Sequence, residues 1–429
     1  MKKIFLLLVV FSSLIFSQFN RNNPSFNKRA SFLFNRIFYS ELYTINQKSN
    51  NAFFLYKIPY ARLLFEKSNG IYKAKFRVSL EIFDYKNNSI QREFDEKTVR
   101  VKSYEITKSI KDYVEGVIQI TFFKKAKKIL PTFSDVFSER EFKGKLIEIN
   151  NFKNNTIFLT PIVVKKRIYH CKDLDNYELA NFGGDFPFSE NKYKILLPIN
   201  DLETDELFVR IKSRGKTIIN KSINNSFNGK LDFKDCEGKI ILNIEDTDNA
   251  YQFFILDNFD KKLVEDPIKI QVSTSSDFSN SHTFSKRIRW FNKPLSLRNT
   301  EQAIKYLKYI EKKSVINNML DHDSFQYAKL LHKYWKKFDP TPNTAYNPIM
   351  KEYYERIDYA MKNFMPISRK NGANTDRGKI YIKYGKPNKI ERTSNTYGQV
   401  TVIWIYNKVR KRFVFIDKYG IGDFSLAAG

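Results

Sequence analysis

The hydrophobic periodicity of this chain changes twice along its length, and that change constrains the fold more than any other feature. Over residues 72–83, YKAKFRVSLEIF, apolar side chains alternate with polar or charged ones, which is typical of a half-buried β-strand. Short segments of this kind, separated by turn residues, continue to about residue 290 and predict β-sandwiches. The period becomes helical near residue 299 and returns to two after residue 380, which predicts a C-terminal α+β unit.

Breaks in this pattern divide the 429 residues into segments. Asp, Asn, Gly and Pro residues gather between the two β regions, as expected of a linker. The predicted segments are a signal peptide (1–17), a lead-in (18–50), a first β-sandwich-like domain (51–170), a linker (171–190), a second β-sandwich-like domain (191–295) and an α+β domain of helices followed by a small antiparallel sheet (296–429).

The N-terminus predicts export. Lys2 and Lys3 precede an uncharged apolar stretch over residues 4–16, and Ser17-Gln18 offers a cleavage site. The apolar stretch is short for a membrane span, and no second run of about 20 apolar residues follows it. We therefore expect a periplasmic or outer-envelope protein without a transmembrane helix in the mature chain; an uncleaved N-terminal anchor is the alternative.

The formal net charge of +28 raises the question of an anionic partner. Because lysines are spread along the whole chain, the charge predicts a generally basic surface, with peripheral contact to an anionic envelope surface. Acidic glycans or lipid head groups fit an exported chain better than nucleic acid, which we do not expect as a partner. A local polyanion site at a hairpin tip that carries Lys408, Arg410, Lys411 and Arg412 is the alternative.

Cys171 and Cys236 are the two cysteines of the sequence. In an exported chain they form a disulfide, or else they are two buried thiols. The four histidines lack zinc-site spacing. No metal and no cofactor are therefore expected.

Several short motifs follow one another in the C-terminal segment: GANTDRG at residues 372–378, YGKP at 384–387 and RFVFID at 412–417, with Gly420, Gly422 and Asp423 behind them. Over residues 299–429 this combination resembles the GWxTD domain of exported bacterial proteins. Ala373 stands where that family has its tryptophan. The resemblance implies an envelope protein with β domains ahead of the GWxTD domain, and it implies no particular reaction.

The polar residues of these motifs are the candidate site. Asp376 is expected in a loop after the third helix, with Arg377 as its partner and Gly378 turning the chain into a strand. If the sheet brings its ends together, a cluster forms in which four carboxylates lie beside Arg377 and Arg392. The four carboxylates are those of Asp376, Glu391, Asp417 and Asp423. The candidate binding residues are Thr375, Asp376, Arg377, Gly378, Tyr384, Gly385, Pro387, Glu391, Arg392, Trp404, Asp417, Gly420, Gly422 and Asp423.

Such a cluster has several interpretations. Its carboxylates are suited to acid/base hydrolysis, to Ca²⁺ or to a peptide or glycan, or they hold turns while Arg pairs with Asp. No Ser-His-Asp, Cys-His, zinc or phosphate-loop pattern favours an enzyme, and we name no catalytic residue. We expect a non-enzymatic envelope interaction or scaffold protein whose C-terminal domain recognises an envelope protein or glycan. A periplasmic hydrolase that uses the acidic cluster is the alternative.

Overall fold

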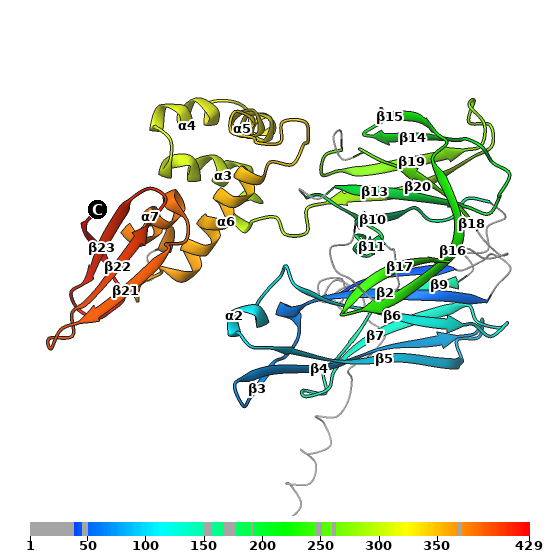
Figure 1. The fold of residues 1–429 in the computed structure, drawn as a ribbon, viewed down its shortest axis with the longest axis horizontal. Helices are drawn as coiled ribbons and strands as arrows, with labels where there is room; N and C mark the ends of the chain where they lie inside the picture. The colour runs from blue at the N-terminus through cyan, green and yellow to red at the C-terminus, as the bar shows by residue number, and fades with distance from the viewer. Residues whose placement is uncertain are drawn as a thin grey trace, which may run out of the picture.

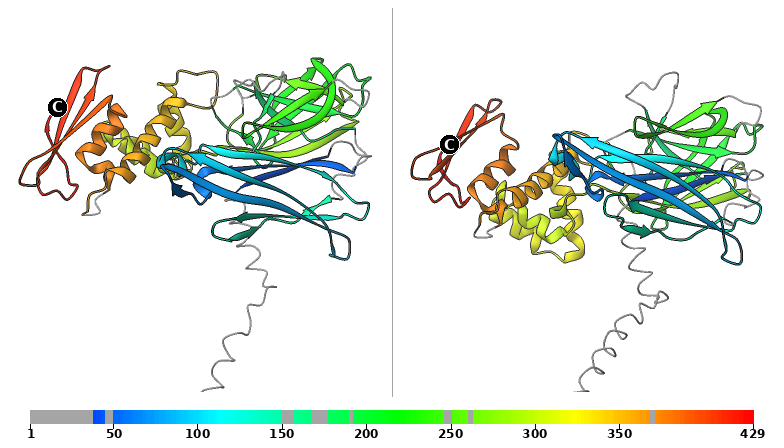
Figure 2. Two further views of the ribbon diagram at one scale, coloured as in Figure 1. Left: turned by 60° about the horizontal axis from the view of Figure 1, so that its bottom comes forward. Right: turned by 90° about the horizontal axis from the view of Figure 1, so that it is seen from below.

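The computed structural model describes residues 38–44, 50–149, 157–166, 177–189, 192–245, 251–259, 263–367 and 371–429. Two β-rich bodies lie together at one end of the long axis, and helices followed by a small sheet extend to the other end (Figure 1). In both turned views of Figure 2 the C-terminal sheet is again the part farthest from the β bodies. The predicted fold class, β domains followed by an α+β domain, is confirmed.

The first β domain contains two sheets, one in the order β1-β2-β6 and one in the order β3-β4-β7-β8, with β5 paired to β4 and β9 paired to β7. The strand pairs are antiparallel. Its elements are β1 (Tyr39–Thr44), β2 (Asn51–Pro59), η1 (Tyr60–Arg62), β3 (Glu66–Ser68), β4 (Ile71–Phe83), β5 (Ser89–Val101), α2 (Tyr104–Thr107), β6 (Tyr113–Thr121), β7 (Lys128–Asp135), β8 (Glu141–Lys143) and β9 (Ile147–Glu148).

Strand β2 is buried on both faces, which explains why its sequence, NAFFLYKIP, is nearly continuous in apolar residues. Phe54 and Tyr56 pack into the core of the first β domain. Phe53 and Leu55 point the other way and share a core cluster with Phe233 of the second β domain. The sheet that contains β2 therefore joins the two β bodies through apolar packing.

The second β domain combines a closed barrel, in the order β10-β11-β17-β16-β18-β13, with a five-stranded sheet, in the order β12-β20-β19-β14-β15. The barrel closes because β13 pairs with both β10 and β18. The strands of the whole second β domain are β10 (Ile162–Lys166), β11 (Tyr177–Leu179), β12 (Phe186–Pro187), β13 (Tyr193–Ile199), β14 (Leu207–Ser213), β15 (Lys216–Ile223), β16 (Ser226–Cys236), β17 (Lys239–Glu245), β18 (Tyr251–Leu256), β19 (Pro267–Ser273) and β20 (Ser281–Arg289).

Strand pairing crosses the predicted domain ranges, which stay a prediction. Strand β10 lies within the range 51–170, yet it pairs with β13 of the second β domain. Strands β11 and β12 lie within the predicted linker 171–190 and pair with β17 and β20. Strand β1 forms part of the predicted lead-in. The predicted signal peptide, residues 1–17, lies outside the described residues.

The C-terminal domain places a group of helices ahead of a four-stranded antiparallel sheet, β21-β22-β23-β24. Among the described residues no helix is long and apolar enough to cross a membrane. The elements are η3 (Leu295–Leu297), α3 (Thr300–Tyr306), η4 (Leu307–Tyr309), α4 (Lys313–Leu320), η5 (Ser324–Gln326), α5 (Tyr327–Lys336), α6 (Pro348–Asn363), η6 (Gly372–Asn374), α7 (Asp376–Tyr384), β21 (Lys389–Ser394), β22 (Val400–Tyr406), β23 (Lys411–Asp417) and β24 (Ser425–Ala428).

The predictions of a loop at Asp376 and of a strand over residues 380–384 are wrong, because both segments belong to α7. Thr375 caps this helix: its side chain accepts a hydrogen bond from the Gly378 N–H. Gly378 and Ile382, four residues apart, are the buried positions. The alternating apolar residues within 380–384 therefore belong to one helix, and five residues are too few to distinguish a helical period from that of a strand.

Candidate functional site

The first residues of the GANTDRG motif attach α7 to its surroundings. The Thr375 hydroxyl donates to the Gly372 carbonyl at 2.7 Å, in addition to capping the helix. The Asp376 carboxylate accepts the Leu426 N–H at 3.0 Å and forms an ion pair with Lys379 at 3.2 Å. The contact between Asp376 and Leu426 connects the start of α7 with the last strand, β24.

Arg377 lies between aromatic rings at the same end of the sheet. Its guanidinium carbon is 3.8 Å from the centroid of the Phe424 ring and 5.3 Å from that of Phe364. Its Nη2 donates to the Gly422 carbonyl at 3.4 Å. Burial lowers the pKa of Arg377 to about 10, against the opposing effect of Asp417. Arg377 therefore remains a cation at neutral pH and binds α7 to the segment after β23.

Asp417 holds the turn that follows β23. Its side chain is buried and accepts the Ile421 N–H at 3.2 Å and the Gly422 N–H at 2.7 Å. Gly420 and Gly422 have φ values of +69° and +81°, a conformation that side chains rarely adopt. The carboxylate is thus used as a local cap for a turn.

The expected cluster of four carboxylates is incomplete. Asp417, Asp423 and Arg392 all act electrostatically on Arg377. Glu391 pairs with Ile403 in the sheet, whereas its neighbour Arg392 pairs with Val402. Because successive residues of a strand point to opposite faces, Glu391 points away from the face that carries Arg392. Its ion pair with Lys389 at 2.8 Å lowers its pKa, the opposite of what a general acid needs.

The remaining motif residues support the joint between α7 and the sheet. Gly385 ends α7 with a φ of +77°, and its carbonyl accepts the Tyr406 hydroxyl. Trp404 of β22 is buried, with its ring near those of Phe364, which follows α6, and Phe415 of β23. Tyr384 packs against Tyr406 and Phe413, and Pro387 is buried. Recognition of a partner by these residues stays a prediction.

A large cleft of about 1420 Å³ lies between the first β domain and the C-terminal domain. Residues of η1 and α2 line one side, and residues of η3, α3, α6 and the end of α7 line the other. Sequence reasoning missed this site because its lining comes from segments up to about 350 positions apart, and only Gly385 of the candidate residues takes part. No short motif marks such a surface.

The lining of this cleft has an excess of positive charge, with eight Lys and Arg residues against four Asp and Glu. Glu352 forms an ion pair with Arg356, and Glu355 forms one with Lys111. Asp358 accepts two backbone N–H groups of η3. Four exposed cations of the lining make no ion pair within the described residues: Arg62, Arg298, Lys362 and Lys386.

Aromatic rings contribute to the same lining. Tyr359 is 45% exposed, and its ring stacks on Tyr381 with the centroids 4.4 Å apart and the planes at 15°. Phe291, also in the lining, stacks on Phe182 with the ring centroids 4.4 Å apart. The cleft therefore offers both cationic groups and flat apolar surface to a ligand.

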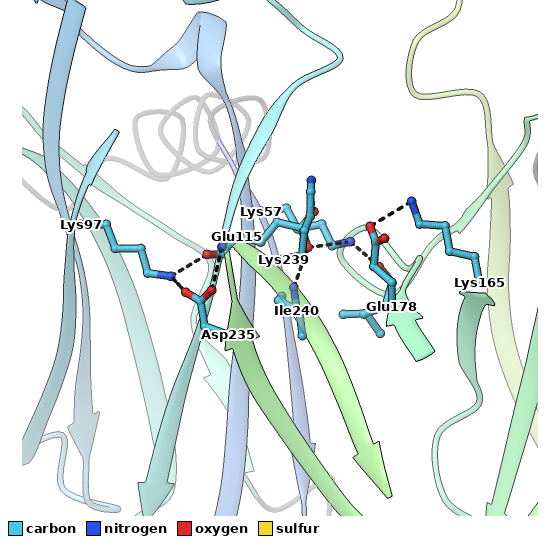
Figure 3. Close-up of polar contacts among 10 residues, drawn as sticks. Lys57, Lys97, Glu115, Lys165, Glu178, Asp235, Lys239 and Ile240 are labelled. Atoms are coloured by element: carbon cyan, nitrogen blue, oxygen red, sulfur yellow. Dashed lines mark hydrogen bonds and ion pairs between the residues drawn. The ribbon is translucent and has the colours of Figure 1, made fainter. Parts of the chain in front are cut away.

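A network of ion pairs lies at the junction of the two β domains (Figure 3). The buried Glu115 of β6 forms ion pairs with the ammonium groups of Lys57, at 3.3 Å, and Lys239, at 3.0 Å, and accepts a hydrogen bond from the Ile240 N–H at 3.1 Å. Burial would raise the pKa of Glu115, but the two lysines and the Ile240 N–H together outweigh it, so that the pKa is lowered. Burial lowers the pKa of Lys57 despite Glu115.

Two further charge pairs extend the network on either side (Figure 3). Glu178 of β11 pairs with Lys165 of β10 at 2.9 Å. Lys97 of β5 pairs with Asp235 of β16, and so links the two β bodies. A single charged residue within each of the apolar strands NAFFLYKIP and YVEGVIQIT was the available sequence signal for this network, since a buried charge needs a partner.

Cys236, the last residue of β16, is disulfide-bonded. Cys171 lies outside the described residues, so the pairing of the two cysteines stays a prediction. Within the described residues, no group of three or more His, Cys, Asp and Glu side chains is placed to hold a metal ion.

The fold and the site define a class of multidomain protein in which two packed β domains precede an α+β domain. The motif residues of the α+β domain connect its last helix, α7, with its sheet. Residues 276–421 match the GWxTD domain. The chain therefore contains a GWxTD domain, and the resemblance predicted from its motifs is confirmed. The match begins ahead of β20, so it includes the last strand of the second β domain. A search of curated proteins found no match.

Proposed function

We propose that this protein is an exported, non-enzymatic envelope protein that binds an extended acidic glycan in the cleft between its first β domain and its GWxTD domain. The observation that carries the proposal is the cleft itself, with its size, its excess of cations and its stacked aromatic rings. The β domains act as a scaffold that supplies one wall.

The size of the cleft favours a polymer. Its volume of about 1420 Å³ exceeds the roughly 300–1000 Å³ of most small-molecule pockets. Arg62 lies on the β-domain side, and Arg298 and Lys386 lie on the GWxTD side, so that an anionic chain along the cleft meets cations from both walls. The exposed ring of Tyr359 suits the apolar face of a sugar.

The contacts of the acidic motif residues give no support to the hydrolase alternative. Asp417 caps a turn and Asp376 holds β24 and Lys379. Glu391 lies on the other face of the sheet with a lowered pKa. Paired carboxylates act in hydrolysis only when their environments assign them an acid and a base.

The test uses the full chain without its predicted signal peptide. Calorimetric titration with polygalacturonate oligomers is compared with titration of neutral dextran and of polyglutamate. A cleft variant, Arg298→Ala with Lys386→Ala, is compared with a control, Lys408→Ala with Arg410→Ala, which removes the same charge from the exposed β22–β23 hairpin.

We expect binding of polygalacturonate, weakened about tenfold or more in the cleft variant and little changed in the control. Dextran should not bind, and binding should weaken with added salt. Equal losses in both variants, or no preference for polygalacturonate over dextran, would reject the cleft as the glycan site. Binding of polyglutamate alone would indicate an acidic protein partner and would reject the glycan.

A further inference from the structure

A second, smaller pocket of about 280 Å³ lies where the three domains meet. Strands β2 and β6 of the first β domain, β10, β11 and β17 of the second, and residues near α6 of the GWxTD domain all contribute to its lining. It shares Tyr113, Trp290 and Phe291 with the large cleft, so the two spaces adjoin. Its volume suits a ligand about as large as one sugar or one aromatic ring.

The charges around this pocket do not balance. Five lysines line it, and two carboxylates, Glu115 and Glu178, face them. A third carboxylate, Glu355, pairs with two of the lysines at the rim, at 2.6 and 4.0 Å. Five ammonium groups against three carboxylates leave an excess of two positive charges. The five lysines are Lys57, Lys111, Lys165, Lys239 and Lys351.

The excess is greatest at Glu115, because one carboxylate serves two ammonium groups. Lys57 is 4% exposed, donates to the Leu179 carbonyl at 2.6 Å and lies 4.7 Å from the centroid of the Phe182 ring. Lys239 shares the same carboxylate, but its side chain is 35% exposed, and Glu115 raises its pKa against the effect of burial, so the incomplete compensation falls on Lys57. A buried cation without a full counter-charge is costly, and an anion supplied from outside relieves that cost. The lowered pKa of Lys57 agrees with incomplete compensation by Glu115 and the more distant Glu178 and Glu41.

We propose that this pocket binds the carboxylate of a compact acidic ligand of about one ring, held by the ammonium groups of Lys57 and Lys239. The aromatic side chains of the lining, among them Phe182 and Phe291, would contact the body of the ligand. The carboxylate belongs either to a free sugar acid or to the terminal uronic residue of a polymer in the adjoining cleft. The charge excess does not depend on what the cleft binds, so the inference stands apart from the proposed function.

The probe is sodium glucuronate, titrated into the full chain without its predicted signal peptide, with glucose and with sodium chloride of equal ionic strength as controls. Lys239→Gln removes one ammonium group and leaves Glu115 paired with Lys57 and the Ile240 N–H. Lys408→Gln makes the same charge change on the distant hairpin. We expect Lys239→Gln to weaken glucuronate binding about tenfold or more, and Lys408→Gln to leave it unchanged.

Glu115→Gln gives the sharper result, because it should change the affinity in the opposite direction. Without this carboxylate both ammonium groups lack their nearest counter-charge, so glucuronate should bind more tightly and should raise the melting temperature more than in the wild type. A purely structural role for Glu115 would weaken binding or leave it unchanged. If this variant does not fold, the glucuronate affinities of Lys239→Gln and Lys408→Gln still decide whether the pocket is the binding site.

Three results would overturn the proposal: glucuronate acting no better than glucose or chloride, equal binding by Lys239→Gln and the wild type, or weaker or unchanged binding by a folded Glu115→Gln. Oligomers identify the source of the carboxylate. If Lys239→Gln also weakens polygalacturonate binding, the pocket takes the end of the polymer; if not, it takes a free acid. If the cleft is not the glycan site, glucuronate should still bind to the pocket. The double substitution Arg298→Ala with Lys386→Ala should then leave the affinity for polygalacturonate oligomers unchanged.

Discussion

The guanidinium group of Arg377 in α7 packs on the ring of Phe424, 3.8 Å from its centroid, and so connects the GANTDRG motif with the segment before the last strand. Its hydrogen bond to the Gly422 carbonyl lies in the same joint. A partly desolvated cation on an aromatic face contributes up to about 2 kcal/mol. This residue of the motif therefore has a measurable structural role whatever partner the protein binds.

We predict that Arg377→Ala lowers the free energy of unfolding by about 2 kcal/mol in urea denaturation, and that Arg377→Lys recovers part of the loss. Lys383→Ala, on the exposed side of the same helix, is the control and should change it by less than about 0.5 kcal/mol. An Arg377→Ala protein as stable as the control would show that the contact with Phe424 adds nothing to the fold.

Gly378 should not tolerate a side chain. A Cβ at this position would lie 2.0 Å from the Gly372 carbonyl oxygen, a backbone atom with little freedom to move. We expect Gly378→Ala to destabilise the protein by about 3 kcal/mol, since overpacking forces the backbone to shift. Thermal unfolding measures the effect, with Lys379→Ala as the neighbouring control. An unchanged melting temperature would mean that α7 and η6 separate easily.

Glu115 should make stability depend on pH. Lys57, Lys239 and the Ile240 N–H together outweigh burial and hold its folded pKa below the ordinary 4.5. A carboxyl group with a lowered folded pKa stabilises the fold above its unfolded pKa, and this contribution is lost as the pH falls through the folded value. The free energy of unfolding should therefore decrease as the pH drops below about 4.5.

Glu115→Gln separates this contribution from those of the other carboxylates. At neutral pH the substitution should cost about 3 kcal/mol, because it leaves the buried ammonium group of Lys57 and the partly exposed one of Lys239 without their shared partner. The difference between the variant and the wild type should shrink as the pH is lowered below 4.5. A difference that stays constant through that range would contradict the assignment.

The predicted disulfide between Cys171 and Cys236 has a direct chemical test. Alkylation of the unfolded chain should add no mass without reductant and two alkyl groups after reduction. A loop of this length predicts that reduction costs roughly 4 kcal/mol of stability. Uptake of alkyl groups without reductant would mean that the two thiols are free.

Sequence reasoning predicted the fold class because long strands carry a strong signal. Alternating residues of β4, such as Phe76, Val78 and Leu80, are all fully buried. It failed at α7, where the nine-residue helix offers too little sequence to separate the two periods and the cap at Thr375 was overlooked. The sequence also does not predict that the barrel closes, since the pairing of β10 with β13 depends on tertiary packing.

The candidate site was predicted only in part. The residues at the start of α7 and those of the Asp417 turn do gather at one end of the sheet, whereas Tyr384 and Gly385 contact Tyr406 at the other end. Glu391 lies on the opposite face, a position that follows from a strand register that the sequence leaves open. The cleft and the lysine pocket could not be found from motifs, because Lys57, Lys239 and Lys351 come close only through the packing of three domains. Their charges are scattered among many other lysines in the sequence.

The decisive measurement for glycan binding in the cleft is hydrogen exchange of the full chain without its predicted signal peptide, in the presence and absence of polygalacturonate oligomers. Binding in the cleft predicts slower exchange at residues 289–298, 352–363 and 381–386, which line its GWxTD side. Protection confined to the hairpin at residues 408–412, or to the Asp417 turn at residues 417–424, would contradict binding in the cleft. The glycan would then bind at the basic hairpin or at the motif residues.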